Sequence, residues 1–321
     1  MGLQLSQCRA LCNLMGTEPA EVIWSVPHFE GGRVKDGGSL RAGVAFECAD
    51  VIERSFCLPL SPKDLVGSFL KAHCFGCPAA ACSCSSGVRA EDTLLLPLGW
   101  GLLLTRAVNG NLSVEYSAEA SRHWLTFRAA RRICPGEDLA VSVPSDDVLP
   151  EPIFLASQSA SGACKLELLE PDEEEADYVL DDAPSSIARH QKPAVKLGAS
   201  SVHGTGMFAT RDIEDGEVVE FVPMLPVSYG EICRCLLREY VFGSDFAPAR
   251  GLDLVLLPLG CGGIYNHSAE HPNLYAARYA DQPFLQAWVA QDFIPAGAEV
   301  FLNYGAGYWQ APWRDAPQRG K

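Results

Sequence analysis

Short runs of aliphatic and β-branched residues, separated by Gly and Pro, dominate the chain. Examples are residues 218–222 (Val-Val-Glu-Phe-Val), 254–257 (Leu-Val-Leu-Leu) and 284–289 (Phe-Leu-Gln-Ala-Trp-Val). Apolar runs of this length, bounded by turn residues, predict strands. We therefore expect a mainly β fold in which helices are short and few.

Two segments carry a helical pattern. In residues 229–240, Ser228 stands in the N-cap position and apolar residues follow at helical spacing. Residues 62–73 follow Ser61 in the same way. The pattern predicts one short helix in each half of the chain.

The chain repeats itself over a long interval. Residues 95–101 (Leu-Leu-Pro-Leu-Gly-Trp-Gly) are echoed by 256–262 (Leu-Leu-Pro-Leu-Gly-Cys-Gly), and 133–139 are echoed by 294–300 at the same offset. Two further pairs of matching segments lie upstream in the same order: 58–61 with 225–228, and 75–76 with 242–243. A period this long indicates a duplicated domain and predicts two tandem related domains.

The repeat suggests how the chain is divided. We expect a leader (1–29), a first copy (30–144), an acidic linker (145–191), a second copy (192–313) and a tail (314–321). The linker contains an acidic run from Glu167 to Asp182, and blocks of like charge usually stay solvated. It is either a flexible spacer or a segment that lies beside an active site and imitates or steers a substrate.

The two copies differ where chemistry would take place. Asn266-His267 of the second copy corresponds to Thr105-Arg106 of the first, and Tyr304 corresponds to Val143. Asn273 of the second copy does have a counterpart, Asn111. The first copy is therefore expected to keep the scaffold without the site, and to serve in packing or in binding a partner.

Three blocks of the second copy resemble the SET domain of protein-lysine methyltransferases, in that family's order and spacing. They are residues 204–209 (Gly-Thr-Gly-Met-Phe-Ala), 263–273 (Gly-Ile-Tyr-Asn-His-Ser-Ala-Glu-His-Pro-Asn) and 303–305 (Asn-Tyr-Gly). Residues 259–309 are most similar to the compact viral-type SET domains. The resemblance implies a β-clip, SET-type fold with a knot-like crossing, S-adenosyl-L-methionine as cofactor, and methyl transfer to lysine. It makes the first copy a degenerate SET-like domain.

The resemblance also implies roles for particular residues. Tyr304 would be the catalytic hydroxyl that orients the amine, and a backbone that approaches the cofactor closely would need the glycines of the first block. Cofactor-binding residues would be Gly204, Thr205, Gly206, Asn266, His267 and Trp309, and Tyr240, Tyr265 and Tyr308 would line the substrate channel. The chain departs from the family at Asn303, where an acidic residue is usual. After Trp309 it also has no cysteine, so the channel would be closed by residues 308–309, by a dimer partner or by the first copy.

The net charge of the chain indicates which class of macromolecule it can bind. The 321 residues include 25 Lys and Arg against 40 Asp and Glu, for a formal net charge of -15. Binding to a nucleic-acid backbone needs clustered cations, so we expect no direct nucleic-acid contact. A basic protein substrate fits, with the histone tail as the family's default, although the charge is equally explained by solubility. A catalytically silent SET-like scaffold that binds peptides is the alternative function.

The remaining signals concern location and metals. No apolar run is long enough to cross a membrane, and no secretory signal is present. We expect an intracellular protein, in nucleus or cytoplasm, unless residues 1–6 direct a lipid to Gly2 and tether it to a membrane.

The thirteen cysteines should be mostly reduced. No metal is expected; the one candidate zinc cluster, equally well a loop of free thiols, is Cys74, Cys77, Cys82 and Cys84.

Overall fold

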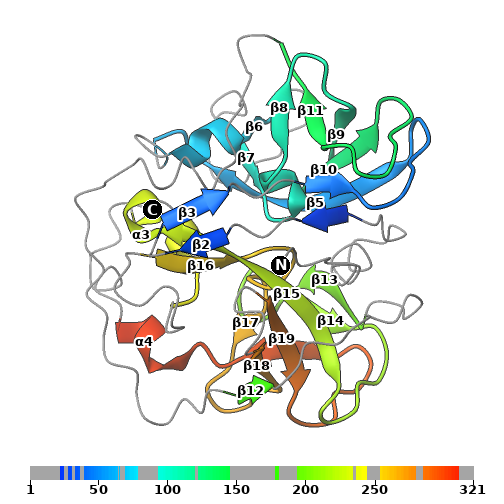
Figure 1. The fold of residues 1–321 in the computed structure, drawn as a ribbon. Coiled ribbons are helices and arrows are strands. Elements are labelled where there is room, and N and C mark those ends of the chain that lie inside the picture. Colours follow the sequence, from blue (N-terminus) through cyan, green and yellow to red (C-terminus); the bar gives the residue numbers. More distant parts are fainter. Residues whose placement is uncertain are drawn as a thin grey trace. The chain divides into compact units, whose positions relative to one another are not determined.

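The structure is a computed structural model (Figure 1). The residues that it describes are 22–24, 28–30, 33–36, 40–63, 65, 69–78, 93–119, 122–144, 178–180, 194–233, 236–243, 254–279 and 285–310. Gly2, Cys82 and Cys84 lie outside these residues, as do most of the expected leader and acidic linker. Their expected roles stay predictions.

The chain falls into two compact units. The amino-terminal unit contains residues 1–165, 184–193 and 222–263, and the carboxy-terminal unit contains 166–183, 194–221 and 264–321. Both are built mainly from strands, so the expected mainly β fold class is confirmed. Among the described residues, no helix has the length and apolar character needed to span a membrane.

A seven-stranded sheet forms most of the amino-terminal unit (Figure 1). Its strand order is β6-β7-β5-β10-β9-β11-β8, and its pairs are antiparallel except that β11 runs parallel to both β8 and β9. The unit also contains two small two-stranded sheets, β1-β4 and β2-β3, and the segment 222–263. The strands are β1 (Val22–Trp24), β2 (His28–Glu30), β3 (Arg33–Asp36), β4 (Leu40–Ala42), β5 (Val51–Leu60), β6 (Phe75–Gly76), β7 (Leu94–Pro97), β8 (Thr105–Ala107), β9 (Leu112–Glu119), β10 (Arg122–Ala129) and β11 (Ala140–Ser142).

The second large sheet has the order β13-β14-β20-β18-β19-β15-β16. Strand β12 adds to β18, and β17 adds to β20 in parallel. The strands are β12 (Tyr178–Leu180), β13 (Val195–Ala199), β14 (Thr205–Ala209), β15 (Val218–Ser228), β16 (Leu254–Pro258), β17 (Asn266–His267), β18 (Leu274–Tyr279), β19 (Leu285–Ala290) and β20 (Glu299–Leu302). Strand β15 begins in the carboxy-terminal unit and continues into the amino-terminal one.

Helices are shorter than the sequence pattern predicts. The expected helix over 229–240 is instead α3 (Tyr229–Ile232) followed by the 3₁₀-helix η6 (Leu236–Glu239). The expected helix over 62–73 contains the 3₁₀-helix η1 (Phe69–His73). Gly230 and the cysteines of the first segment are poor helix formers, which explains why α3 is so short. The described residues also form the helices η4 (Trp100–Leu102) and α4 (Gly305–Gln310).

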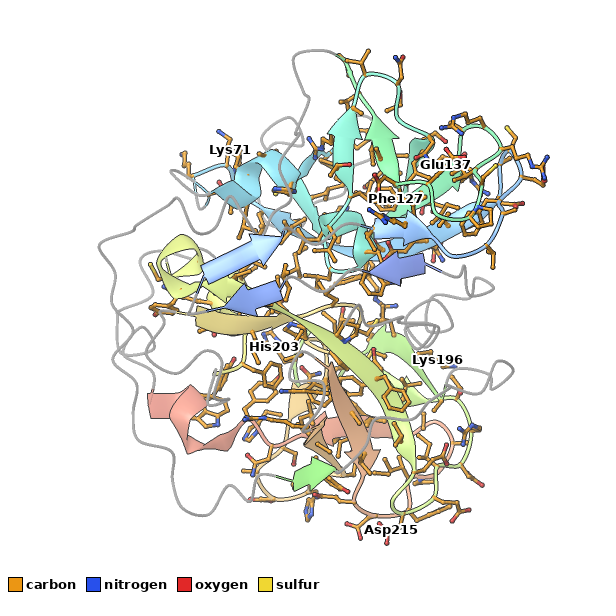
Figure 2. The ribbon with its side chains drawn as sticks, in the orientation of Figure 1. Lys71, Phe127, Glu137, Lys196, His203 and Asp215 are labelled. Carbon is orange, nitrogen blue, oxygen red and sulfur yellow. The ribbon has the colours of Figure 1, made fainter. Side chains whose placement is uncertain are left out.

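Each unit has its own apolar core. In the amino-terminal unit, the fully buried Phe127 of β10 packs edge-on against Phe75, with ring centroids 5.8 Å apart (Figure 2). In the carboxy-terminal unit, the alternating residues Val300 and Leu302 of β20 are buried, and Trp288 of β19 is fully buried. Burial of aromatic side chains of this size supplies much of the free energy that holds such small sheets.

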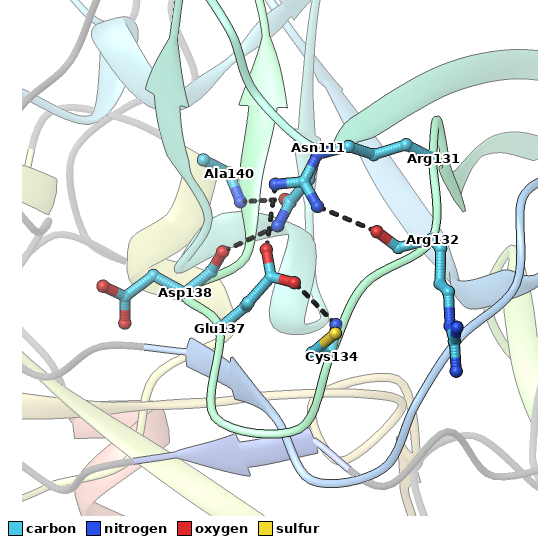
Figure 3. Close-up of polar contacts among 7 residues, drawn as sticks. All are labelled: Asn111, Arg131, Arg132, Cys134, Glu137, Asp138 and Ala140. Atoms are coloured by element: carbon cyan, nitrogen blue, oxygen red, sulfur yellow. Dashed lines mark hydrogen bonds and ion pairs between the residues drawn. The ribbon is translucent and has the colours of Figure 1, made fainter.

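The same polar bridge occurs once in each sheet. Asn111, a buried residue just before β9, donates from Nδ2 to Asp138 O and accepts at Oδ1 from Ala140 N, at 2.9 and 3.0 Å (Figure 3). Asn273, just before β18, makes the equivalent pair of bonds to Glu299 O and Phe301 N, at 3.2 and 2.7 Å. In both places one amide side chain satisfies two backbone groups of a parallel neighbour that the sheet leaves open.

Two tight turns also recur with the same backbone conformation. Gly136 (φ 87°) and Gly297 (φ 84°) occupy the third position of turns before β11 and β20. Gly216 (φ 76°) ends the turn before β15, and the corresponding turn before β5 places Ala49 at φ 74°. The left-handed region is favourable for Gly and strained for Ala, so the amino-terminal turn adopts this conformation without the glycine that suits it.

A buried carboxyl lies in the middle of the amino-terminal sheet. Glu53 of β5 is 4% exposed, and its Oε1 accepts a hydrogen bond from Trp100 N at 2.7 Å. Its Oε2 has no hydrogen-bond partner among the described residues. Burial raises the pKa of Glu53 to about 7, because the charged form loses its solvation.

Glu53 should make the stability of this unit depend on pH. The unfolded chain ionises this carboxyl near the ordinary glutamate pKa of 4.5, whereas the folded protein keeps it protonated up to a pKa of about 7. Its contribution is therefore fully present below pH 4.5 and is lost as the pH rises to about 7, by a total on the order of 3 kcal/mol. We expect Glu53→Gln, which cannot ionise, to gain stability relative to wild type across this interval. Urea unfolding at several pH values measures the difference, and a difference that is independent of pH would contradict the account.

Candidate active site

Two segments far apart in the sequence meet in the carboxy-terminal unit. Strand β17 pairs in parallel with β20, so that Asn266 lies opposite Phe301 and His267 opposite Leu302. The backbone N–H of Ser268 continues the ladder to Leu302 O at 3.1 Å. Because β20 ends two residues before Tyr304, this pairing brings Tyr304 to the residues that flank β17.

Tyr304 is held by hydrogen bonds at its side-chain hydroxyl and at its backbone N–H. Its hydroxyl donates to the backbone carbonyl oxygen of Tyr265 at 2.5 Å, and its backbone N–H donates to Nδ1 of His267 at 3.1 Å. The side chain is half-buried. Since the phenol proton is committed to a carbonyl, the phenol oxygen can act toward any further partner only as an acceptor.

An aromatic cluster surrounds this tyrosine. The ring of Tyr308 meets Tyr304 edge-on, with centroids 4.5 Å apart. The ring of His267 lies 5.2 Å from that of Tyr304 and 4.9 Å from that of Trp309, centroid to centroid. Tyr308 and Trp309 belong to the short helix α4, which begins directly after Tyr304. Trp309 is 50% exposed.

His267 is held as a neutral base. Burial lowers the pKa of His267, because the imidazolium would lose its solvation. Its Nδ1 accepts the N–H of Tyr304, and a neutral imidazole that accepts at Nδ1 carries its proton on Nε2. The ring therefore supports Tyr304 without adding a positive charge.

The Asn266 amide ties three segments together. Its Nδ2 donates to the backbone carbonyls of His203 and Thr205 at 3.2 and 3.3 Å, and to Oε1 of Glu299 at 2.8 Å. His203, labelled in Figure 2, precedes the turn that leads into β14. The side chain is 7% exposed. Asn266 thus fixes the loop expected to hold the cofactor, and its Oδ1 makes no hydrogen bond among the described residues.

The glycines of this loop serve different purposes. Gly204 has φ 50°, a conformation that favours Gly, and a Cβ there would meet nothing within 4 Å. A Cβ on Gly206 would lie 2.1 Å from Oε1 of Glu299 and 2.9 Å from Nδ2 of Asn266. Gly206 is therefore needed for the contact between Asn266 and Glu299, and Gly204 for the turn itself.

Sequence comparison assigns a family to this part of the chain. The family model described as the SET domain matches residues 204–305. Residues 204–305 form a SET domain. The match spans all three blocks on which the resemblance was based, and it contains every hydrogen-bond partner named above for Tyr304 and Asn266 except His203. Tyr308 and Trp309 lie just beyond its end. The expected recognition is confirmed for this region.

Solved structures resemble the chain only weakly. One is a Plasmodium falciparum protein crystallised as a candidate histone methyltransferase (27% identity, TM-score 0.31), for which the likeness covers 37% of this chain and 100% of that one. Another is the Chaetomium thermophilum polycomb repressive complex 2, in an autoinhibited conformation bound to S-adenosylmethionine (26% identity, TM-score 0.30). There the likeness covers 35% of this chain and 15% of that one. The TM-scores are low, and nothing below depends on these likenesses. No curated protein sequence matches the chain.

The SET domain brings together most of the predicted site residues. The loop 204–206, Asn266, His267, Tyr304, Tyr308 and Trp309 are linked by the contacts above. Tyr265 is 1% exposed, and its hydroxyl donates to Oε2 of Glu220 at 2.7 Å. Tyr240 belongs to the amino-terminal unit, where burial raises its pKa. Their roles at a substrate channel stay predictions.

Two acidic residues of the site were not predicted from the sequence. Glu299 supports Asn266, and Glu220 binds Tyr265. A signal for Glu220 was present, because it is the one charged residue in the apolar run 218–222, and a carboxyl in such a strand needs a partner.

The cysteine cluster remains only partly described. The thiol of Cys74 donates to Leu70 O at 3.4 Å, and that of Cys77 lies 4.0 Å from the Tyr116 hydroxyl. Within the described part of the chain, no group of three or more His, Cys, Asp or Glu residues is arranged to hold a metal. Cys82 and Cys84 lie outside that part, so the zinc alternative stays untested.

Gly206→Ala should weaken the SET domain at this point. The new methyl group would displace the Glu299 carboxylate and break its hydrogen bond to Asn266, which we expect to cost about 1–3 kcal/mol in the free energy of unfolding. The matched control is Gly243→Ala, because a Cβ at Gly243 meets nothing within 4 Å. Urea unfolding compares the two variants, and equal stability of both would show that the Gly206 contact is not needed.

Proposed function

We propose that the SET domain is an S-adenosyl-L-methionine-dependent protein-lysine N-methyltransferase that acts on a basic protein, with a histone tail as the first substrate to test. The hydrogen bond from the Tyr304 hydroxyl to the Tyr265 carbonyl carries the proposal. It places one oriented phenol oxygen beside the segment 266–267, which implies a catalytic hydroxyl next to a cofactor site. The SET family match at residues 204–305 supports the same reaction class.

The residues present fit the cofactor. When bound, S-adenosyl-L-methionine supplies a methyl group on a positively charged sulfur. Oδ1 of Asn266 is an acceptor suited to its ammonium group, and the backbone of His267 is suited to the edge of its adenine. Half-exposed Trp309 offers a face on which a purine ring can stack. The cofactor would thus be held by acceptors and aromatic rings.

Tyr304 would orient the substrate amine. Its hydroxyl proton is committed to the Tyr265 carbonyl, so its oxygen can only accept a hydrogen bond from the lysine nitrogen. That bond would point the nitrogen lone pair along the line of attack. Alignment of this kind supplies most of the rate in a direct displacement.

The lysine must also lose a proton before it can attack. Aromatic walls disfavour the ammonium form and lower its pKa through desolvation. Tyr304, Tyr308 and Trp309 provide such a wall, with centroid separations of 4.5 to 6.5 Å. Burial also lowers the pKa of His267, so this ring adds no positive charge to the wall.

We further propose that residues 30–144 are a degenerate SET-like copy that serves as a scaffold, and that 192–313 are the catalytic domain. The matching Asn111 and Asn273 bridges and the matching turns support the duplication. Arg106 stands where His267 stands in the second copy. Its guanidinium donates to Cys74 O at 2.7 Å and lies 4.4 Å over the ring of Phe75. A side chain engaged in this way leaves that position unsuited to a cationic cofactor.

Tyr304→Phe should abolish most of the methyl transfer while leaving the fold intact. We expect its kcat to fall about 100-fold, because the amine loses the acceptor that aligns it. The measurement is transfer of labelled methyl from S-adenosyl-L-methionine to core histones. Tyr116→Phe is the matched control: it removes a hydroxyl bonded to His123 Nδ1 at 3.0 Å in the amino-terminal unit, and it should keep full activity.

Two outcomes would contradict this account. Full activity of Tyr304→Phe would remove the hydroxyl from the mechanism. A wild-type protein that binds the cofactor and labels no protein substrate would instead be a catalytically silent scaffold.

A further inference from the structure

We propose that Glu220 is a positioning residue of the active site: through buried Tyr265, it fixes the carbonyl group that holds the Tyr304 hydroxyl. The inference rests on the proposed methyltransferase function. It adds a residue that touches neither cofactor nor substrate and that sets where the phenol oxygen points.

The link consists of two consecutive hydrogen bonds. The Tyr265 hydroxyl donates to Oε2 of Glu220 at 2.7 Å, and the Tyr265 carbonyl accepts from the Tyr304 hydroxyl at 2.5 Å. Glu220 and Tyr265 are each 1% exposed. One tyrosine therefore connects a buried carboxyl, through its own side chain and peptide group, to the hydroxyl that would orient the amine.

Burial makes this link stiff. A carboxyl withdrawn from water needs hydrogen-bond partners, and a bond from a hydroxyl to a carboxyl group is strengthened in a low-dielectric interior. The Tyr265 ring is thus anchored at its far end, while its backbone is continuous with β17. With both ends held, the carbonyl of Tyr265 has little freedom to turn away from Tyr304.

The amino-terminal domain shows which part of this arrangement belongs to the fold. Leu98 N bonds to Phe56 O there, as Leu259 N bonds to Pro223 O in the second copy. Counting back three residues from each acceptor places Glu53 and Glu220 at the same position of β5 and β15.

The tyrosines, unlike the glutamates, are found in one copy alone. Thr105 lies opposite Ala140, as Asn266 lies opposite Phe301, so the residue before each, Leu104 or Tyr265, holds the same place. Val143 likewise stands where Tyr304 stands. The first copy keeps its buried carboxyl, directed to the backbone N–H of Trp100, without either hydroxyl. A buried glutamate is thus common to both scaffolds, and its bond to a tyrosine occurs only where Tyr304 is present.

This division of roles predicts a specific defect. Loss of the Glu220 acceptor should let the Tyr265 carbonyl move and misplace the Tyr304 hydroxyl, which lowers kcat. Affinity for S-adenosyl-L-methionine should change little, because the proposed cofactor contacts at Asn266, His267 and Trp309 do not involve Glu220.

The test uses the full-length protein and four variants. Glu220→Leu and Tyr265→Phe each remove one partner of the hydrogen bond between Tyr265 and Glu220, and the double variant removes both. Glu220→Gln keeps an acceptor oxygen. We expect kcat to fall about 10- to 100-fold in Glu220→Leu and Tyr265→Phe, with no further loss in the double variant. Glu220→Gln should stay near the wild-type rate, and the cofactor Kd from calorimetry should change less than about twofold in all of them.

Glu53→Leu is the matched control. It removes the equivalent buried carboxyl of the other copy, so it should lose stability and keep kcat. The inference is overturned if Glu220→Leu retains the wild-type kcat, if Glu220→Gln loses as much as Glu220→Leu, or if the two single losses add.

A second readout works without turnover and separates this inference from the proposed function. In protein labelled with ¹³C at the tyrosine ζ carbon, the Tyr304 resonance can be assigned by its absence from Tyr304→Phe. We expect it to shift in Glu220→Leu and Tyr265→Phe and to keep its wild-type position in Glu220→Gln and Glu53→Leu. An unchanged Tyr304 resonance in Glu220→Leu and Tyr265→Phe would show that Glu220 does not position Tyr304, whether or not the protein methylates anything.

Discussion

The parallel pairing of β17 with β20 is the contact on which the site depends. Parallel neighbours need a long connection between them, and here the connection is the hairpin β18-β19. The same strand β20 also runs parallel to β18, with Leu274 opposite Leu302. Strand β20 is therefore fixed on two sides, and Tyr304, two residues after its end, is delivered to the backbone of Tyr265.

Buried polar groups then convert this crossing into a defined geometry. Asn273 bonds to the backbone of β20, and Asn266 joins the loop before β14 to Glu299 of β20. Glu220 accepts a hydrogen bond from the Tyr265 hydroxyl. Each of these groups would cost free energy if it were left without partners. Their bonds restrain the arrangement of the strands around the site more strictly than apolar contacts could, because hydrogen bonds require direction as well as proximity.

The amino-terminal domain has the features that maintain the sheet and lacks the residues proposed for methyl transfer. It has the bridge at Asn111, the turn at Gly136 and the buried carboxyl of Glu53. Arg106 and Val143 stand at the positions of His267 and Tyr304. The shared features maintain a curled sheet, and the features confined to the second copy are the ones that could hold a cofactor and orient an amine. This contrast is the physical basis for assigning catalysis to one half of the chain.

Sequence patterns predicted the parts of the site that are local. The mainly β fold and the SET blocks were readable from the sequence, and both are confirmed. That Asn266 and Tyr304 serve one site stays a prediction, which the parallel pairing of β17 with β20 supports. Glu299 and Glu220 were not identified, because their partners are 33 and 45 residues away and no local pattern reports such a bond. Tyr265 was assigned to the substrate channel from the family resemblance, which does not show that its hydroxyl bonds to Glu220. The helix over 229–240 was overestimated because apolar periodicity does not register that Gly230 and Cys233 are poor helix formers.

The most direct measurement is a crystal structure of the wild-type protein in complex with S-adenosyl-L-methionine. The account predicts that the transferable methyl group lies in van der Waals contact with the Tyr304 hydroxyl oxygen, with the adenine against Trp309 and the ammonium at Asn266. A cofactor bound elsewhere, or one whose methyl group faces away from Tyr304, would contradict it.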